Sequence, residues 1–171
     1  MTFRISERQA HDVANDFLFA TGRSLLEGKY DQFRSYFRLP LFLETQNGLR
    51  IVTTEHALRQ TYDGVRDHHR AQGVTDQVRS LLSVQVLGHN SFSFTHVTGL
   101  IGPNGKVVQH PFPAQSVVTR SSGVWAISGC FYAILRDRKL SDVLASDLPP
   151  DVRQDRDGAT PGGTHPSTPR G

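Results

Sequence analysis

The sequence predicts an α+β fold with about three helices in its N-terminal half and a long antiparallel sheet in its C-terminal half. Two observations support this prediction. Apolar residues recur with helical spacing through most of residues 6–72, and from residue 78 they alternate with polar residues as they do in strands. The chain has 171 residues, enough for one domain with a buried core. We expect that domain to span residues 1–148.

The first 40 residues predict two helices of unequal length. Ser6 and Gln9 fit the S-x-x-Q capping box, and apolar residues then recur at helical spacing. Gly28 is the residue type that most often follows a helix end, so the long helix should cover about residues 6–27. A shorter helix is predicted in "KYDQFRSYF". Pro40 should end it, because a proline keeps the preceding residue out of the helical region.

A hairpin and a third helix should follow. Residues 39–53 contain two apolar arms around Asn47-Gly48, a pair that is typical of a tight hairpin turn. Thr54 is a suitable N-cap, and the next apolar pattern has helical spacing. The sequence therefore predicts a helix over about residues 55–72.

The remaining pattern is that of an antiparallel meander. Four long strands are predicted between residues 78 and 135, joined by short turns. Pro111 and Pro113 cannot donate ladder hydrogen bonds, so that part of the third long strand should be an edge, a bulge or a bend. Residues 149–171 are rich in proline and glycine and lack apolar periodicity, which predicts a disordered tail.

Composition excludes several classes of protein. The net charge is only +3 and the charges of both signs interleave, so we expect no nucleic-acid partner. No apolar run is long enough for a membrane helix, and the N-terminus lacks the apolar segment of a signal peptide, which predicts a cytoplasmic protein with no membrane contact. A single cysteine excludes an internal disulfide and a cysteine-based zinc site. We found no cofactor or metal motif.

Three stretches together resemble the nuclear transport factor 2-like (NTF2-like) superfamily, and within it the SnoaL-like branch. "FLFATGRSLLEGKYDQFRSYF" is similar to its paired N-terminal helices, "TTEHALRQTYDGV" to its third helix, and "GVWAISGCFYAIL" to its final strand. The resemblance covers about residues 6–136. It implies a cone-shaped curved sheet wrapped by helices (an α+β barrel), with a pocket at the open end. It also implies a homodimer formed through the convex sheet face.

Strand alternation predicts which side chains share a face. A two-residue turn near Ser122 would place Trp125 on the same face as the even-numbered residues of the preceding strand, His110 among them. Ile127 and Phe131 would share that face, and Cys130 would lie on the opposite, convex face. Because Ile127 and Phe131 are the larger apolar set, we expect Trp125 to face the cavity. A three-residue turn or a bulge would reverse these assignments.

Two histidines are the best candidates for acid–base chemistry, because imidazole titrates near neutral pH. We assign the catalytic role to His110, on the face predicted for Trp125. For His96 the direction depends on the turn at "GPNGK": a two-residue turn would point it outward, and a bulged turn inward. Cys130 is expected to be inert packing. The predicted substrate-binding residues are Phe17, Thr21, Tyr36, Tyr62, Phe112, Ser116 and Trp125.

The acidic residues decide between the activities that the superfamily implies. Residues 91–135 contain no Asp or Glu, so the arrangement of the superfamily's isomerases, with aspartates in the cup, is absent. The dehydratase pattern could be assembled only from Asp31 or Asp63, His96, His110 and Tyr36. The resemblance implies either a cofactor-independent lyase or isomerase that binds a small, mainly apolar ligand, or a non-catalytic binding module. The sequence leaves both open.

Overall fold

The computed structural model describes residues 4–134, 140 and 143–144. Within them the chain forms α-helices and one mixed six-stranded sheet, which confirms the predicted α+β class. The strand order across the sheet is β2-β1-β6-β5-β4-β3. In chain order the elements are α1 (Glu7–Glu27), α2 (Tyr30–Arg34), β1 (Phe37–Thr45), β2 (Gly48–Val52), α3 (Glu55–Ala71), β3 (Asp76–Gly88), β4 (Ser91–Ile101), a 3-10 turn (Pro103–Gly105), β5 (Val107–Ser121) and β6 (Val124–Tyr132).

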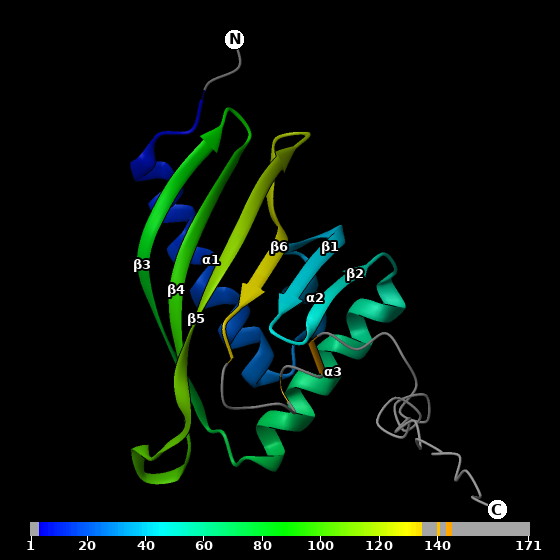
Figure 1. Ribbon diagram of the computed structural model, residues 1–171, viewed down its shortest axis with the longest axis vertical. Coiled ribbons are helices and arrows are strands. Elements are labelled where there is room, and N and C mark those ends of the chain that lie inside the picture. Colours follow the sequence, from blue (N-terminus) through cyan, green and yellow to red (C-terminus); the bar gives the residue numbers. More distant parts are fainter. Residues whose placement is uncertain (1–3, 135–139, 141–142, 145–171) are drawn as a thin grey trace, which may run out of the picture.

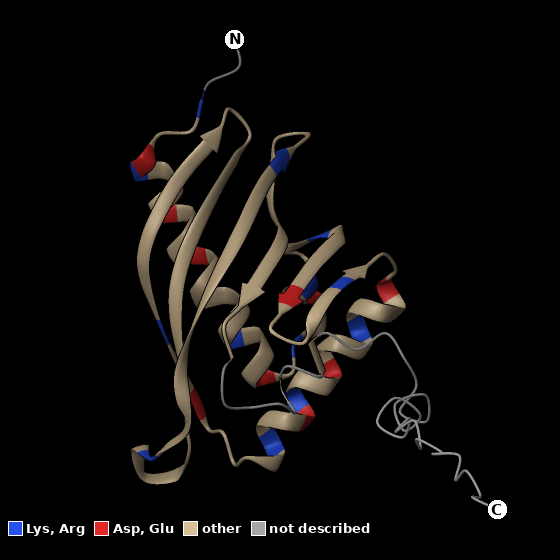
Figure 2. Cartoon of the chain, in the orientation of Figure 1, with Lys and Arg blue, Asp and Glu red and all other residues tan. Residues whose placement is uncertain are grey.

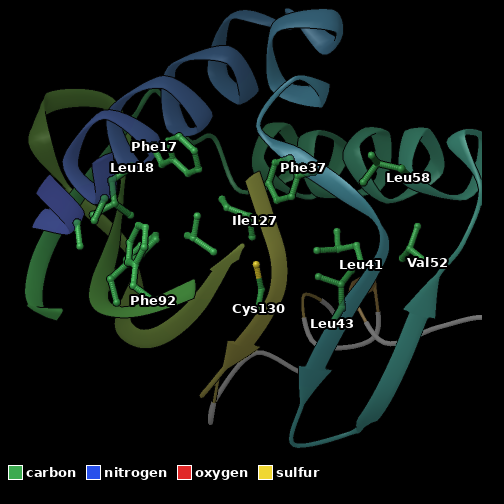
Figure 3. Packing of buried hydrophobic residues seen from close by; sticks show 14 of the residues in the cluster. Phe17, Leu18, Phe37, Leu41, Leu43, Val52, Leu58, Phe92, Ile127 and Cys130 are labelled. Carbon is green, nitrogen blue, oxygen red and sulfur yellow. The ribbon is translucent and has the colours of Figure 1, made fainter. Parts of the chain in front are cut away.

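The sheet is strongly curved, and α1 lies across the concave side of its long strands (Figure 1). The main hydrophobic core fills the space between them, with residues from α1 packed against β4, β5 and β6. Phe17 and Leu18 of α1, Phe92 of β4 and Ile127 of β6 belong to this cluster (Figure 3). Within the described part of the chain, the main core therefore lies on the concave face of the sheet, between α1 and the strands.

The helix boundaries follow the predicted capping residues. The Ser6 hydroxyl accepts a hydrogen bond from the Gln9 backbone N–H (3.2 Å), and the Gln9 side chain accepts one from the Ser6 N–H (3.1 Å). Gly28 ends α1 in the left-handed conformation with φ of 76°. Thr54 caps α3 by accepting from the Ala57 N–H (3.1 Å).

Two local predictions in the first half are wrong. Pro40 does not end the short helix: α2 stops at Arg34, and Pro40 lies inside β1, after a cis peptide bond. The hairpin turn consists of Gln46 and Asn47, because Thr45 pairs with Gly48 at the start of β2. The proline is tolerated because β1 forms a regular ladder with its neighbours only beyond it.

The four-strand meander is confirmed, and so is the irregularity at the prolines. The β4–β5 register shifts after Thr98, and Ala114 is the first β5 residue that pairs with β6. Pro111 and Pro113 therefore lie where β5 is bulged or unpaired on one side. The sequence did not predict that β1 pairs in parallel with β6, which joins the hairpin to the meander.

Two single-residue bulges decide which side chains face inward. In β3, Leu81 pairs with His96 and Ser83 with Thr95, so Leu82 is an extra residue. In β6, Ile127 pairs with Val118 and Gly129 with Val117, so Ser128 is an extra residue. Each bulge inverts the inward and outward alternation of the strand beyond it.

The predicted disordered tail, residues 149–171, lies outside the described residues, as does the predicted end of the domain. In the part of the chain that the structure does describe, no helix is both long and apolar enough to cross a membrane.

Candidate functional site

A cavity of about 90 Å³ lies on the concave side of the sheet, enclosed by α1, α3 and the strands. Leu140 and Leu144 also line it and pack against Phe112 and Ile134. Its large apolar and aromatic lining residues include Phe17, Phe33, Phe37, Tyr62, Phe94 and Phe112. Its polar lining residues are Thr21, Thr61, His69, Gln77, Arg79, His96, Thr98, Ser116, Cys130 and Tyr132.

Regular spacing brings most of these side chains together. Phe17, Thr21 and Leu25 are four residues apart on α1 and so share its inner face. On β4, alternate residues from Phe94 to Thr98 point inward. Five predicted substrate-binding residues accordingly line the cavity: Phe17, Thr21, Tyr62, Phe112 and Ser116.

His110 does not line the cavity. It is exposed and lies at the β5 bulge, where the alternation that places Phe112 and Ala114 inside is broken. The prediction that His110 faces the cavity is therefore wrong. His96 takes the inward position, because it pairs with Ala114 on the inner face and the turn before β5 is longer than two residues.

Trp125 and Cys130 share the inner face of the sheet, contrary to the prediction. The extra residue Ser128 reverses the alternation between them, so Cys130 is buried and lines the cavity, while Phe131 faces outward. Figure 3 shows Cys130 beside Ile127 among the core side chains. Trp125 points inward but lies away from the cavity, where its ring packs edge-on against Phe92 at 5.4 Å.

Tyr36 also lies outside the cavity lining. Its ring packs edge-on against Phe17, with centroids 5.3 Å apart, and its backbone carbonyl accepts a hydrogen bond from the Ile127 N–H (2.8 Å). It therefore supports the cavity wall from behind. The dehydratase-like set that would combine Tyr36 and His110 with His96 is not assembled.

Arg79 is the main cavity residue that the sequence did not single out. In the sequence, Val78, Leu82, Val84 and Val86 all fall at even positions, and strict alternation would place them on one face. The bulge at Leu82 separates them: Val78 and Leu82 are exposed, and Arg79 points inward. No simple sequence signal marks this bulge.

The Arg79 guanidinium reaches α1. Its Nη1 donates to the Thr21 hydroxyl at 2.8 Å and to the Leu18 carbonyl at 3.5 Å, and its Nε is buried without a hydrogen-bond partner. Gly22 leaves room for the neighbouring Gln77 side chain, because a Cβ there would lie 3.1 Å from Gln77 Oε1, whereas its 3.7 Å distance from Arg79 Nη1 would be an ordinary contact. Burial lowers the pKa of Arg79, but a guanidinium remains charged at neutral pH.

Two inward histidines are neutral. Burial, followed by the positive charge of Arg79, lowers the pKa of His96 to about 3. The pKa of His69 falls to about 4, through burial first and then repulsion from His68 and Arg79. The Nδ1 atoms of His96 and His69 are buried and have no hydrogen-bond partner in the part of the chain that the structure describes.

The neighbouring thiol and phenol are neutral as well. Cys130 Sγ lies 3.8 Å from Ser116 Oγ. Burial raises the pKa of Cys130, and burial together with the nearby thiol raises the pKa of Tyr132 well above its usual value. The cavity thus combines one permanent cation with several neutral donors and acceptors.

Carboxylates are missing from this arrangement. No Asp or Glu lines the cavity, and no salt bridge to Arg79 occurs within the described part of the chain. Among the same residues no group of three or more His, Cys, Asp or Glu side chains could hold a metal ion. The site is suited to electrostatic and hydrogen-bonding contacts with a small organic molecule.

No family model matches the sequence, and neither does any curated protein. Solved structures do resemble it. A Nostoc punctiforme domain of unknown function with a cystatin-like fold is 14% identical, with a TM-score of 0.60 over 76% of this chain and 80% of that one. An NTF2-like protein with a cystatin-like fold from Novosphingobium aromaticivorans is 13% identical, with a TM-score of 0.58 over 81% and 90%.

A third structure, an NTF2-like protein of unknown function from Shewanella oneidensis, is 10% identical, with a TM-score of 0.54 over 72% of this chain and 98% of that one. At these identities the likeness concerns the fold and not the activity. The chain therefore has the NTF2-like, cystatin-like fold that its sequence resembles.

Proposed function

We propose that this chain binds a small molecule in the cavity of its cone and acts on it as a cofactor-independent lyase or isomerase. One observation carries the proposal: His96 is 5% exposed, lines the cavity, and has a buried Nδ1 that finds no partner among the described residues. A buried polar atom that lacks a hydrogen bond is costly, and a bound ligand would remove that cost. The lyase or isomerase activity is what the SnoaL-like resemblance implies, and membership of that branch stays a prediction.

In the proposed reaction His96 is the acid–base group. Its ring is neutral, so it can accept a proton from a carbon next to a carbonyl group. Returning the proton to another carbon completes an isomerisation. In an elimination, the bond to a leaving group on the next carbon breaks, and the group departs with the electron pair and takes the proton from His96. Charge that develops on the substrate oxygen would be stabilised by Arg79. The same negative charge would raise the pKa of His96 and make it a stronger base.

Deuterium exchange tests this step without knowledge of the natural substrate. A set of small ketones and carboxylic acids is incubated with the protein in D2O, and loss of carbon-bound protons is followed by proton NMR. We expect exchange with the wild type and with His110→Gln, whose histidine is exposed, and none with His96→Gln. Exchange that survives in His96→Gln would refute the role of His96.

The second candidate function is a non-catalytic binding module. It is favoured by the lack of a cavity carboxylate within the described residues and by the small cavity volume of about 90 Å³. Binding of a member of the set without any deuterium exchange would support this alternative over the enzyme.

We also propose a homodimer formed through the outer face of the sheet. Cys130 and Tyr132 line the cavity and cannot contribute to that contact. Large apolar side chains are exposed elsewhere on the sheet: Phe42, Ile51 and Phe131 are 40%, 46% and 37% exposed. Phe42 pairs with Ile51 across β1 and β2. β4 and β6 carry no Lys, Arg, Asp or Glu (Figure 2). Such an apolar, weakly charged surface is typical of a protein contact.

A further inference from the structure

The cavity contains a positive charge that the described part of the protein does not neutralise. Among the described residues, the Arg79 guanidinium donates hydrogen bonds only from Nη1, to two uncharged oxygens, the Thr21 hydroxyl and the Leu18 carbonyl. Its Nε is buried and has no partner among the same residues. Arg79 as a whole is half-buried, because it also borders the outer hollow between α1 and β3, but its Nε is shielded from solvent. A guanidinium that is withdrawn from water in this way normally has a carboxylate beside it, because an unpaired charge away from water is unfavourable.

The groups that influence Arg79 electrostatically do not supply a negative charge. They are Tyr132 and Cys130, and the raised pKa of each keeps it protonated at neutral pH. His69 and His96, whose own titration Arg79 affects, are neutral. At neutral pH this part of the cavity therefore carries one net positive charge.

We propose that the ligand of this cavity is a small organic acid whose carboxylate binds Arg79, with His96 or His69 as a second hydrogen-bond donor. The inference rests on the proposed ligand-binding function and specifies its substrate class. A guanidinium has donors at Nε and at both Nη atoms, and a carboxylate fits two of them side by side. Among the described residues the Nδ1 atoms of these two neutral imidazoles have no partner. Either Nδ1 can bear the ring N–H and donate a hydrogen bond to the carboxylate.

Charge and volume favour a carboxylate over a phosphate. One cation matches the single charge of a carboxylate, whereas a phosphate group brings close to two charges at neutral pH. The cavity of about 90 Å³ is smaller than the roughly 150 Å³ cavity that holds benzene. The bound acid should therefore have few atoms beyond its carboxylate, or should displace the apolar wall as it enters.

Matched pairs of acids and amides test the charge requirement directly. Acetate, isobutyrate and benzoate are titrated into 15N-labelled protein at pH 7, alongside acetamide, isobutyramide and benzamide. Each pair has the same shape but differs in charge. We expect at least one acid to bind at least tenfold more tightly than its amide, with shifts at the backbone amides of Arg79, His96 and Thr21.

Two arginine variants locate the anion. Arg79→Met should weaken binding of the acid at least thirtyfold and remove the preference over the amide, and Arg79→Lys should retain part of it. Arg23→Met is the matched control, because Arg23 lies with Arg79 in the outer hollow between α1 and β3 but does not line the cavity. The Arg23→Met variant should bind the acid as tightly as the wild type does. Loss of binding in Arg23→Met with retention in Arg79→Met would overturn the inference.

The outcomes also separate this inference from the proposed function. Equal binding of acids and amides at cavity residues would reject the proposal that the ligand is an acid, but the cavity would remain a general ligand site. The absence of shifts at cavity residues with every probe would reject both. As a readout independent of the variants, a bound acid should shift the imidazole resonances of His96 in the wild type at pH 7, and the matching amide should not. Unchanged imidazole resonances under saturation with the acid would contradict contact with the carboxylate.

Discussion

Arg79 Nη1 donates a 2.8 Å hydrogen bond to the Thr21 hydroxyl, and this contact links β3 to α1 across the wall of the cavity. The Thr21 hydroxyl itself donates to the Phe17 carbonyl at 2.6 Å. The hydroxyl thus fixes one side of the guanidinium, while the buried Nε is left for a ligand. We therefore expect Arg79 to favour ligand binding while it lowers the stability of the ligand-free protein.

Replacing Arg79 with methionine should stabilise the protein while it removes acid binding. Methionine occupies a similar volume without a charge, and removing a half-buried charge that has no ion-pair partner is expected to add about 1–2 kcal/mol to the free energy of unfolding. For a chain of this size the melting temperature should rise by roughly 2–8 °C. Calorimetry of Arg79→Met and of the exposed control Arg59→Met measures this. A marked decrease in stability would mean that the protein itself compensates the charge.

Replacing Thr21 with valine should destabilise the protein by about 1–3 kcal/mol, because the guanidinium loses its best acceptor while it remains buried. Thr21→Ser keeps the hydroxyl and is the matched control. In the double variant Thr21→Val, Arg79→Met most of the loss should disappear, since no donor is left without its acceptor. Chemical denaturation of the four proteins gives the coupling. Additive effects would show that the hydrogen bond contributes nothing.

The two buried histidines predict a stability that falls on acidification. A histidine whose pKa is lower in the folded state binds fewer protons than in the unfolded state. Stability is therefore fully present above the unfolded pKa of about 6.5 and is lost as the pH falls toward the folded value. With a pKa of about 3 for His96 and about 4 for His69, each should cost roughly 2 kcal/mol at pH 5 relative to pH 8.

Denaturant midpoints between pH 5 and pH 8 test this, a range in which most carboxylates stay ionised. His96→Gln should remove about half of the pH dependence, whatever its effect at pH 8. His110→Gln should change it little, since His110 is exposed. A wild-type stability that is flat over this range would show that both imidazoles can be protonated in place.

The order of elements and the helix caps could be predicted because they depend on local interactions. The Ser6–Gln9 box, the left-handed Gly28 and the Thr54 cap involve residues within a few positions of each other. The residues of α1 that face the cavity could also be predicted, because side chains three or four positions apart stay on one side of a helix along its length. Phe17 and Thr21 therefore lie where the sequence placed them.

The inward residues of the strands could not be predicted with the same security. Alternation has a period of two, so a single extra residue inverts every assignment beyond it. With the bulge at Leu82, Arg79 points inward and Val78 is exposed, and with the bulge at Ser128, Cys130 lies inside. Each bulge depends on pairing with a neighbouring strand, which a single stretch of sequence does not encode.

The bulge at Ser128 gives a direct prediction for the thiol of Cys130. The side chain is 3% exposed and faces the core, and burial raises its pKa, so little reactive thiolate forms. An aromatic disulfide reagent should label the native protein at least about 1000-fold more slowly than the denatured protein, because labelling must wait for unfolding. Ser80→Cys in a Cys130→Ala background is the control, since Ser80 is exposed on β3. The thiol of this control should be labelled in the native protein about as fast as in the denatured protein. Equally fast labelling of Cys130 would place it on the outer face, and β6 would then lack the bulge.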